Sequence, residues 1–256
     1  MLEKELDDLR PTHVISCIGR THGMIDGTEI GTIDYLEYPG KLVDNIRDNL
    51  YAPVLLAKLC QERGIHYTYL GTGCIFEYDE KHEDIGFIEQ DKPNFFGSSY
   101  SIVKGFTDQM MKWYDVLNVR IRMPITAQPN PRDFITKIAN YQKICSMPNS
   151  MTVLDELLPL LADMIIKKRT GTIHLTNPGI ISHQEILEMY KEIIDPNKTW
   201  ETMTYQQQSE LLRSKRSNNY LDTTLLQQWY PMVSDIHTAM RRTLEKRKEL
   251  IESLFL

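Results

Sequence analysis

The sequence lacks the features that several classes of protein require. Its four cysteines include no Cys-x-x-Cys pair and no cysteine–histidine cluster at metal-ligand spacing, so we expect free thiols and no metal site. No uninterrupted apolar run reaches the length of a membrane span, and the acidic start lacks the pattern of a signal peptide. Lys and Arg total 29 against 35 Asp and Glu, a net charge of -6, which excludes bulk electrostatic attraction to nucleic acid or anionic lipid. We expect a cytoplasmic protein with small-molecule partners, no nucleic-acid partner and no membrane partner.

What the sequence does contain is an alternation of short apolar runs with stretches of helical periodicity, which is typical of α/β proteins. Apolar residues make up 41% and charged residues 25% of the 256 positions, the balance of a globular chain with a packed core. The pattern predicts strands at 13–18, 66–70, 116–123 and 172–176, and helices at 44–64, 98–114 and 185–194.

Tyr100 and Lys104 give the sharpest local signal for chemistry. Residues four apart lie on one face of a helix, so the Lys104 ammonium can approach the Tyr100 phenol. A nearby positive charge favours the phenolate and makes the tyrosine a usable proton donor near neutral pH. Because any helix can carry Tyr-x-x-x-Lys, an exposed tyrosine beside a solvated lysine explains the pattern as well.

Thr72 and Cys74 follow a predicted strand directly, and α/β sheets form their ligand sites at the carboxyl ends of strands. Thr72 and Tyr100 could hold a carbonyl oxygen there, while Tyr100 gives a proton and a cofactor gives a hydride. Cys74 could reach a substrate carbon next to that carbonyl. The plain alternative for a free cysteine is a small buried apolar residue.

Eight segments spread over nearly the whole chain carry a more specific pattern: residues 71–78, 93–100, 120–125, 130–137, 148–158, 176–179, 183–190 and 216–219. Together they closely resemble the bifunctional nucleotide-rhamnose epimerase/reductases, which also form the C-terminal half of plant rhamnose synthases. These enzymes are relatives of dTDP-4-dehydrorhamnose reductase and GDP-fucose synthase. The resemblance implies a Rossmann-like, doubly wound parallel sheet of the extended short-chain dehydrogenase/reductase type. It places an NAD(P)-binding domain at 1–125 and a smaller, discontinuous substrate-binding part at 126–256, which can return a strand to the sheet.

The resemblance also implies a two-stage reaction on UDP-4-keto-6-deoxy-glucose. The ketone acidifies the protons on carbons 3 and 5, and an acid–base pair that falls on Cys74 and Lys137 removes and returns them. NADPH, with NADH as the alternative, then reduces the 4-ketone with Thr72, Tyr100 and Lys104 in the roles above, which gives UDP-L-rhamnose. A homodimer and a separate 4,6-dehydratase that acts first are further expectations from the family. The choice between a uracil and a thymine base stays open.

Further binding residues come from the resemblance alone. The cofactor-binding set is Cys17, Gly19, Asn49, Tyr100, Lys104 and Pro124. The substrate-binding set is Thr72, Cys74, Asn149, Arg216, Asn218 and Asn219. The guanidinium fork of Arg216 suits diphosphate oxygens. An ordinary loop stays the alternative for each of the weaker positions.

The chain departs from the family at its start. The family begins with a strand, a glycine-rich turn, a helix and a second strand, which hold the cofactor's diphosphate at a helix N-terminus. This sequence has no such segment, and its first predicted strand, 13–18, resembles a later strand of the cofactor domain. We expect the absent strands to belong to the middle of the sheet, so that their removal exposes apolar faces and unpaired strand edges. Either about thirty residues, the length of one such unit, precede Met1 in the native protein, or the chain is a truncated product.

Two other functions stay open. One is a reductase only, acting on a dTDP- or UDP-4-keto sugar that another protein has epimerised, against which Cys74 and Lys137 argue. The other is a non-catalytic regulatory subunit on the same fold. The absent glycine-rich turn favours this second alternative, whereas the intact Thr72, Tyr100 and Lys104 argue against it.

Overall fold

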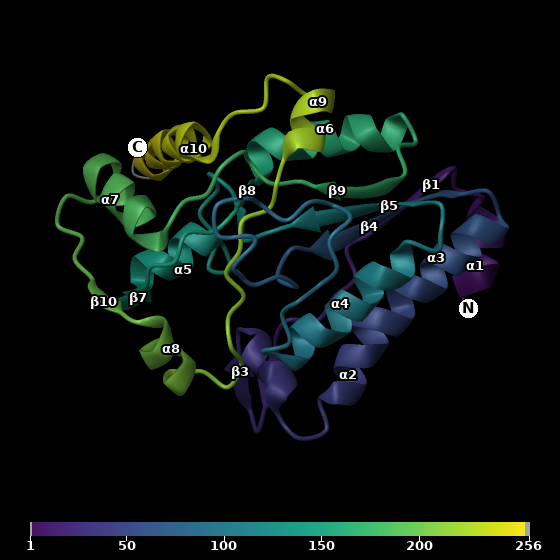
Figure 1. Cartoon of the computed structure of the whole chain (residues 1–256), viewed down its shortest axis with the longest axis horizontal. Coiled ribbons are helices and arrows are strands. Elements are labelled where there is room, and N and C mark those ends of the chain that lie inside the picture. The colour runs from purple at the N-terminus through teal and green to yellow at the C-terminus, as the bar shows by residue number, and fades with distance from the viewer. Residues whose placement is uncertain (1, 254–256) are drawn as a thin grey trace.

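A parallel sheet of four strands, in the order β1-β4-β5-β9, forms the centre of the computed structural model, which describes residues 2–253 (Figure 1). The strands are β1 (His13–Ser16), β4 (His66–Thr72), β5 (Val116–Ile121) and β9 (Gly171–His174). Almost every residue of β4 and β5 is buried, because helices cover both faces of an interior parallel strand. The predicted Rossmann-like α/β class is confirmed.

Two groups of helices cover the sheet, one on each face (Figure 1). They are α2 (Leu42–Ile46), the π-helical turn η2 (Arg47–Tyr51), α3 (Ala52–Glu62) and α4 (Ser99–Met111) on one face, and α6 (Leu154–Ile166) and α9 (Thr224–Trp229) on the other. Leu56 of α3 packs with Tyr67 of β4, and Leu157 of α6 packs with Val119 of β5. The single helix predicted at 44–64 is in fact α2, η2 and α3 in direct succession, interrupted by the π-helical turn.

Strand β1 lies at the edge of the sheet and pairs only with β4 among the described residues. The four described strands are direct neighbours, so the place at which the absent strands would join the sheet stays a prediction. The expected unpaired edge is found at β1, where Ile15 is 52% exposed. Helix α1 (Leu2–Leu9) precedes β1 and buries Leu6 against the core of the α3 side.

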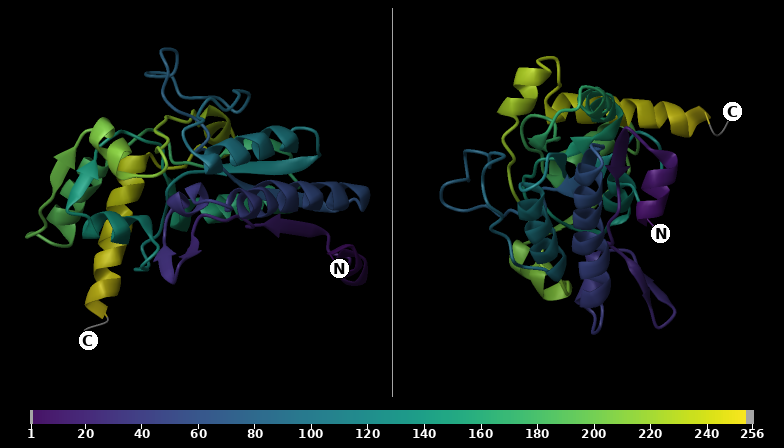
Figure 2. Two further views of the ribbon diagram at one scale, coloured as in Figure 1. Left: turned by 90° about the horizontal axis from the view of Figure 1, so that it is seen from below. Right: turned by 90° about the vertical axis from the view of Figure 1, so that its right-hand side faces the viewer.

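A second lobe lies beside the carboxyl ends of the strands (Figure 2). It contains β6 (Pro124–Ile125), α5 (Phe134–Asn140), β7 (Lys143–Cys145), β8 (Thr152–Val153), α7 (His183–Ile193), β10 (Glu201–Met203), α8 (Tyr205–Leu211) and α10 (Ile236–Ser253). Ile135, Ile186 and Met240 meet in its fully buried core. The capping box predicted from Ser182 and Glu185 is present at the start of α7.

A hairpin and a short 3-10 helix connect β1 to α2 and border the site. They are β2 (Gly23–Ile25), β3 (Thr28–Ile30) and η1 (Ile33–Glu37). Asp26 and Gly27 form the hairpin turn with φ of +47° and +79°, the left-handed backbone that the tight turn requires.

Candidate active site

A cavity of about 770 Å³ opens where β4 and β5 end, between the sheet and the second lobe. Eleven of the predicted site residues line it: Cys17, Gly19, Asn49, Thr72, Cys74, Tyr100, Lys104, Pro124, Lys137, Arg216 and Asn218. They come from seven separate stretches of the chain. The cavity therefore assembles most of the site that the family resemblance implies.

Thr72 is the last residue of β4, and Tyr100 is the second residue of α4, whose N-cap Ser98 accepts a hydrogen bond from the Ser101 amide. The Thr72 hydroxyl accepts a hydrogen bond from the Cys74 amide at 3.0 Å, which fixes its position at the cavity floor. Burial is the main cause that raises the pKa of Tyr100, and the hydrogen bond with Thr72 opposes it. Tyr100 therefore carries its proton and can donate it.

Lys104 is only 4% exposed, and its ammonium donates a hydrogen bond to the Tyr69 hydroxyl rather than to Tyr100. The ammonium also lies 4.6 Å from the centre of the Tyr69 ring. Burial lowers the pKa of Lys104 to about 8, and the nearby carboxylate of Asp108 opposes that shift. The expected pairing of Lys104 with the Tyr100 phenol is thus not the arrangement in this structure, because Tyr69 takes the ammonium.

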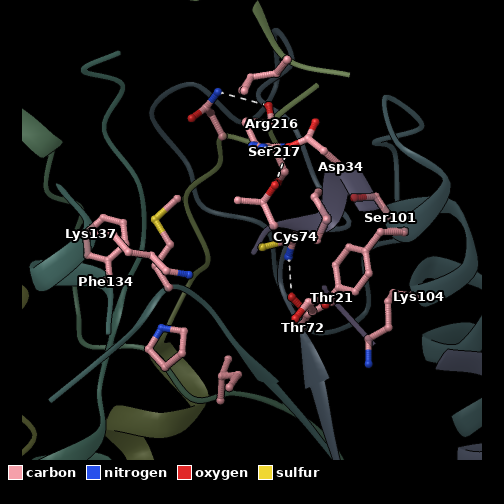
Figure 3. A pocket seen from close by; sticks show the side chains of 18 of the residues that line it. Thr21, Asp34, Thr72, Cys74, Ser101, Lys104, Phe134, Lys137, Arg216 and Ser217 are labelled. Carbon is pink, nitrogen blue, oxygen red and sulfur yellow. Dashed lines mark hydrogen bonds and ion pairs between the residues drawn. The ribbon is translucent and has the colours of Figure 1, made fainter. Parts of the chain in front are cut away.

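Cys74 and Lys137 occupy the same cavity. In the view of Figure 3, Lys104 lies on one side of Cys74, and Lys137 with Phe134 lies on the other. Burial and the charge of Arg132 lower the pKa of Lys137, while Asp133 opposes the shift. A thiol and an amine thus face the cavity from different elements, as proton exchange on two faces of a substrate requires.

Helix α5 holds Lys137 through a buried anchor at its start. Asp133 is the N-cap, accepts a hydrogen bond from the Thr136 amide at 3.0 Å, and pairs with Arg247 of α10 at 2.7 Å. This anchor fixes the helix that carries Lys137 to the core of the second lobe.

The loop after β1 forms the part of the cavity where the cofactor is expected. Asn49 belongs to the π-helical turn. Its side-chain oxygen accepts a hydrogen bond from the Arg20 backbone N–H, and its side-chain nitrogen donates to the Arg20 carbonyl and to the Asn45 side chain. A Cβ on Gly19 would lie 3.1 Å from the Asn49 oxygen, so glycine lets the loop approach the helix closely. Asn49 lines the cavity and also holds this loop in place.

Arg216 and Asn218 line the opposite end of the cavity. The Arg216 guanidinium pairs with Asp34 at 2.5 Å. Burial opposes ionisation of Asp34, but hydrogen bonds from Thr32 and Arg216 together lower its pKa to about 2. The ion pair joins η1 to the segment after α8, and both of its residues line the cavity.

Asn149 and Asn219 are fully buried and are not among the residues that line the cavity. The Asn149 side chain accepts from Arg122 and donates to Asn218, and Asn219 donates to the carbonyls of Gly73 and Phe76. In this arrangement both asparagines hold the neighbouring loops together, and their direct contact with substrate stays a prediction.

Four residues in or beside the cavity were not predicted from the sequence. Asp34, Phe134 and His183 line it, and Arg122 lies buried beside it. His183 begins α7, and its shielded Nε2 has no hydrogen-bond partner. Arg122 and His183 both fall within segments that resemble the family, so the resemblance was the sequence signal that could have pointed to them.

Residues 2–253 contain neither a candidate metal site nor a candidate membrane-spanning helix. No group of three or more His, Cys, Asp or Glu side chains there is placed to hold a metal ion. No helix in the same range has both the length and the apolar character needed to cross a membrane.

The parallel sheet with a Thr–Tyr–Lys set at the end of β4 and the start of α4 defines an extended short-chain dehydrogenase/reductase. No protein-family model matches the chain. The crystal structure of dTDP-4-dehydrorhamnose reductase from Bacillus anthracis, in complex with NADP, shares this fold. The TM-score is 0.75 and the identity 17%, over 98% of this chain and 84% of that one.

Two relatives identify the family. The protein L780 of Acanthamoeba polyphaga mimivirus is 55% identical over 251 residues, which cover 96% of this chain and 86% of L780. The crystal structure of L780, described as a UDP-rhamnose synthase, matches with a TM-score of 0.91 over 96% of this chain and 85% of that one. A bifunctional dTDP-4-dehydrorhamnose 3,5-epimerase/reductase of Arabidopsis thaliana is 42% identical over 241 residues, covering 92% of this chain and 77% of that protein. The chain belongs to this family of bifunctional nucleotide-rhamnose epimerase/reductases.

Proposed function

We propose that the protein converts UDP-4-keto-6-deoxy-glucose to UDP-L-rhamnose by 3,5-epimerisation followed by reduction of the 4-ketone with NADPH. The observation that carries the proposal is the convergence of Thr72, Tyr100 and Lys104 with Cys74 and Lys137 in one cavity. The first three residues suit carbonyl reduction, and the last two suit proton exchange at the carbons beside the carbonyl. The name of the Arabidopsis relative states the same pair of activities, and L780 is described as a UDP-rhamnose synthase, which supports the product.

For reduction, the ketone oxygen lies between the hydroxyls of Thr72 and Tyr100. Both are hydrogen-bond donors, and the buried Tyr100 phenol keeps the proton that the new alcohol needs. A bound nicotinamide cofactor would supply a hydride for the ketone carbon. Lys104 holds a positive charge near the developing alkoxide, in a buried site where charge acts more strongly than in water.

For epimerisation, the same two hydroxyls polarise the ketone and acidify the protons on carbons 3 and 5. Cys74 and Lys137 then remove a proton from one face and return one to the other. Their placement on different elements lets them approach the sugar from different directions (Figure 3).

The residues fit a nicotinamide cofactor and a nucleotide sugar. Cys17 and Gly19 line the part of the cavity proposed for a ribose and its phosphates, and Tyr100, Lys104 and Pro124 also line the cavity. Arg216, whose guanidinium lines the other end, suits the sugar diphosphate. We place NADPH ahead of NADH and uracil ahead of thymine, the latter because L780 is described as a UDP-rhamnose synthase.

Three further features extend the proposal. The substrate is a product of 4,6-dehydration, so a separate 4,6-dehydratase must supply it.

Phe106, Met110 and Trp113 form an exposed apolar stripe along α4 and just beyond it, which supports a homodimer through this face. All four cysteines are unpaired, which supports a reducing compartment, the cytoplasm.

The test is to incubate the purified protein with UDP-4-keto-6-deoxy-glucose and NADPH and to identify the product by NMR. UDP-L-rhamnose with matching oxidation of NADPH is the expected result. Turnover of a pre-epimerised sugar alone would indicate a reductase without epimerase activity. Binding of NADPH without turnover of any keto sugar would indicate a regulatory subunit.

A further inference from the structure

Arg122 is a buried cation without a counter-charge. It follows β5 directly, is 1% exposed, and forms no ion pair within residues 2–253. Its guanidinium donates to four neutral oxygens: those of Gly73 (3.5 Å), the Ser217 side chain (3.0 Å), the Ser217 backbone (2.7 Å) and the Asn149 side chain (2.5 Å). Its Nε has no partner.

The other two buried arginines of the described chain show that this is unusual. Arg120 pairs with Asp108 through two hydrogen bonds of 2.8 Å, and Arg247 pairs with Asp133 at 2.7 Å. A buried charge without a partner is costly, because the interior replaces little of the solvation that water would give. Among the buried arginines of the described chain, only Arg122 carries this cost, and it lies beside the cavity. This points to an anion that forms during the reaction.

Cys74 is the group placed to become that anion. The Arg122 stem runs beneath the loop, since a Cβ on Gly73 would lie 3.5 Å from Arg122 Cδ, and the guanidinium contacts the carbonyl bonded to the Cys74 nitrogen. Cys74 lines the cavity and Arg122 does not, so the thiol faces the substrate while the cation lies behind it.

The other charged and titratable groups around this pair are few. Tyr100 and Lys104 of α4 face Cys74, and Tyr78 and His183 lie near Arg122. Burial raises the pKa of both tyrosines and lowers that of His183 to about 4, so all three stay neutral near neutral pH. Cys74 therefore has two cations nearby, Lys104 on the reduction side and Arg122 behind its loop.

We propose that Arg122 is a positioning residue for epimerisation, which favours the thiolate form of Cys74 and so makes it the base. The inference rests on the proposed function. In the step, the thiolate takes a proton from the carbon beside the ketone, an S–H bond forms, and the C–H electron pair moves into an enolate. The Lys137 ammonium returns a proton to the opposite face, and exchange with solvent restores both groups.

The test measures how fast iodoacetamide alkylates Cys74 as a function of pH, because only the thiolate reacts. Cys17 is exposed, so the measurements use a Cys17→Ser background, in which Cys60 and Cys145 are buried. Arg122→Gln removes the charge and Arg122→Lys retains it. In the glutamine variant the pH midpoint should rise by about one unit, which lowers the rate at neutral pH about tenfold, and the lysine variant should restore most of it.

A second variant leaves the arginine in place. Asn149→Asp puts a carboxylate of nearly unchanged shape on the Arg122 guanidinium and neutralises its charge. It should shift the alkylation midpoint in the same direction as Arg122→Gln, and it should move the pH profile of deuterium exchange at carbons 3 and 5 by the same amount. Equal midpoints in the parent protein, Asn149→Asp and Arg122→Gln would overturn the inference.

The alkylation assay needs neither substrate nor cofactor, so it separates this inference from the proposed function. A shifted midpoint in a protein that converts no keto sugar would contradict the proposed function and leave the Arg122–Cys74 pairing intact. Full conversion to UDP-L-rhamnose with unshifted midpoints would support the proposed function and overturn the inference about Arg122.

Discussion

The sheet side of the cavity and the side formed by α5 and α7 differ in how they hold their polar groups. On the sheet side Lys104 is bonded to Tyr69, and Thr72 is bonded to the Cys74 backbone. On the other side, neither the Lys137 ammonium nor the Nε2 of His183 has a hydrogen-bond partner in the described structure. Reduction needs donors fixed in advance around one oxygen, whereas proton exchange at two carbons needs groups that are free to reach the substrate.

The largest expected effect comes from the sheet side of the cavity, where the donors are held in place. Tyr100→Phe removes the proton donor, and the rate of ketone reduction should fall by about 10²–10⁴-fold, the usual worth of a positioned acid. Deuterium exchange should fall much less, because Thr72 still holds the oxygen. NADPH oxidation and NMR measure the two activities. Tyr141→Phe, a change of the same kind at a half-exposed residue that also lines the cavity, is the control. Equal losses of both activities in Tyr100→Phe would break the distinction between the two sides.

The corresponding experiment on the side formed by α5 and α7 changes Lys137. Lys137→Met should reduce deuterium exchange at the sugar by about 10²-fold or more, because one face loses its proton donor. Reduction of a pre-epimerised sugar should keep its kcat. Lys143→Met is the matched control, since Lys143 lines the same cavity but pairs with Glu201 at 2.9 Å. Unchanged exchange in Lys137→Met would remove Lys137 from the mechanism.

A pH profile tests the smaller contribution of Tyr69. Burial lowers the pKa of Lys104 to about 8, so its positive charge, and with it kcat/KM for reduction, should decline as the pH rises above about 8. Tyr69→Phe removes the acceptor of the ammonium, which should lower this pKa further and move the decline to lower pH. An unchanged profile in Tyr69→Phe would show that the bond between Lys104 and Tyr69 has no part in catalysis.

The smallest effect concerns stability alone. Ser182→Ala removes the capping box of α7 and should cost about 1 kcal/mol of unfolding free energy, a decrease in Tm of about 2–4 °C. Thermal unfolding measures it, with Ser253→Ala at the far end of α10 as the control. A loss of reductase activity in Ser182→Ala at a temperature where it is folded would show that the two sides are more tightly coupled than their contacts indicate.

The sequence predicted the parts of the site that depend on local spacing. Tyr100 and Lys104 share a helix face, and Thr72 follows a strand, so both positions follow from a pattern over a few residues. The partner of Lys104 could not be predicted in this way, because Tyr69 lies 35 positions away on a strand whose alternation shows burial but not which side chain it meets. The pair between Asp34 and Arg216 joins residues 182 positions apart, and no local pattern signals it.

The fold shows the same limit. Strands β4 and β5 were predicted because each is a short run rich in apolar and aromatic residues, although both also bury polar side chains, such as Thr68 and Asn118. Helix α6 was missed, since Pro159 interrupts its pattern although the helix continues through it. The β2–β3 hairpin was not predicted, although Asp-Gly is typical of a tight turn, because strands of only three residues give no clear pattern. The absence of a carboxylate beside Arg122 appears only when the packing of the whole site is known.

The most direct test of the account is deuterium exchange in the absence of NADPH. The protein is incubated with UDP-4-keto-6-deoxy-glucose in D₂O, and the sugar is followed by NMR. If the two sides of the cavity carry separate chemistry, deuterium should enter at carbons 3 and 5 without cofactor, and later addition of NADPH should give deuterated UDP-L-rhamnose. A folded protein that consumes NADPH but incorporates no deuterium at either carbon would contradict the account.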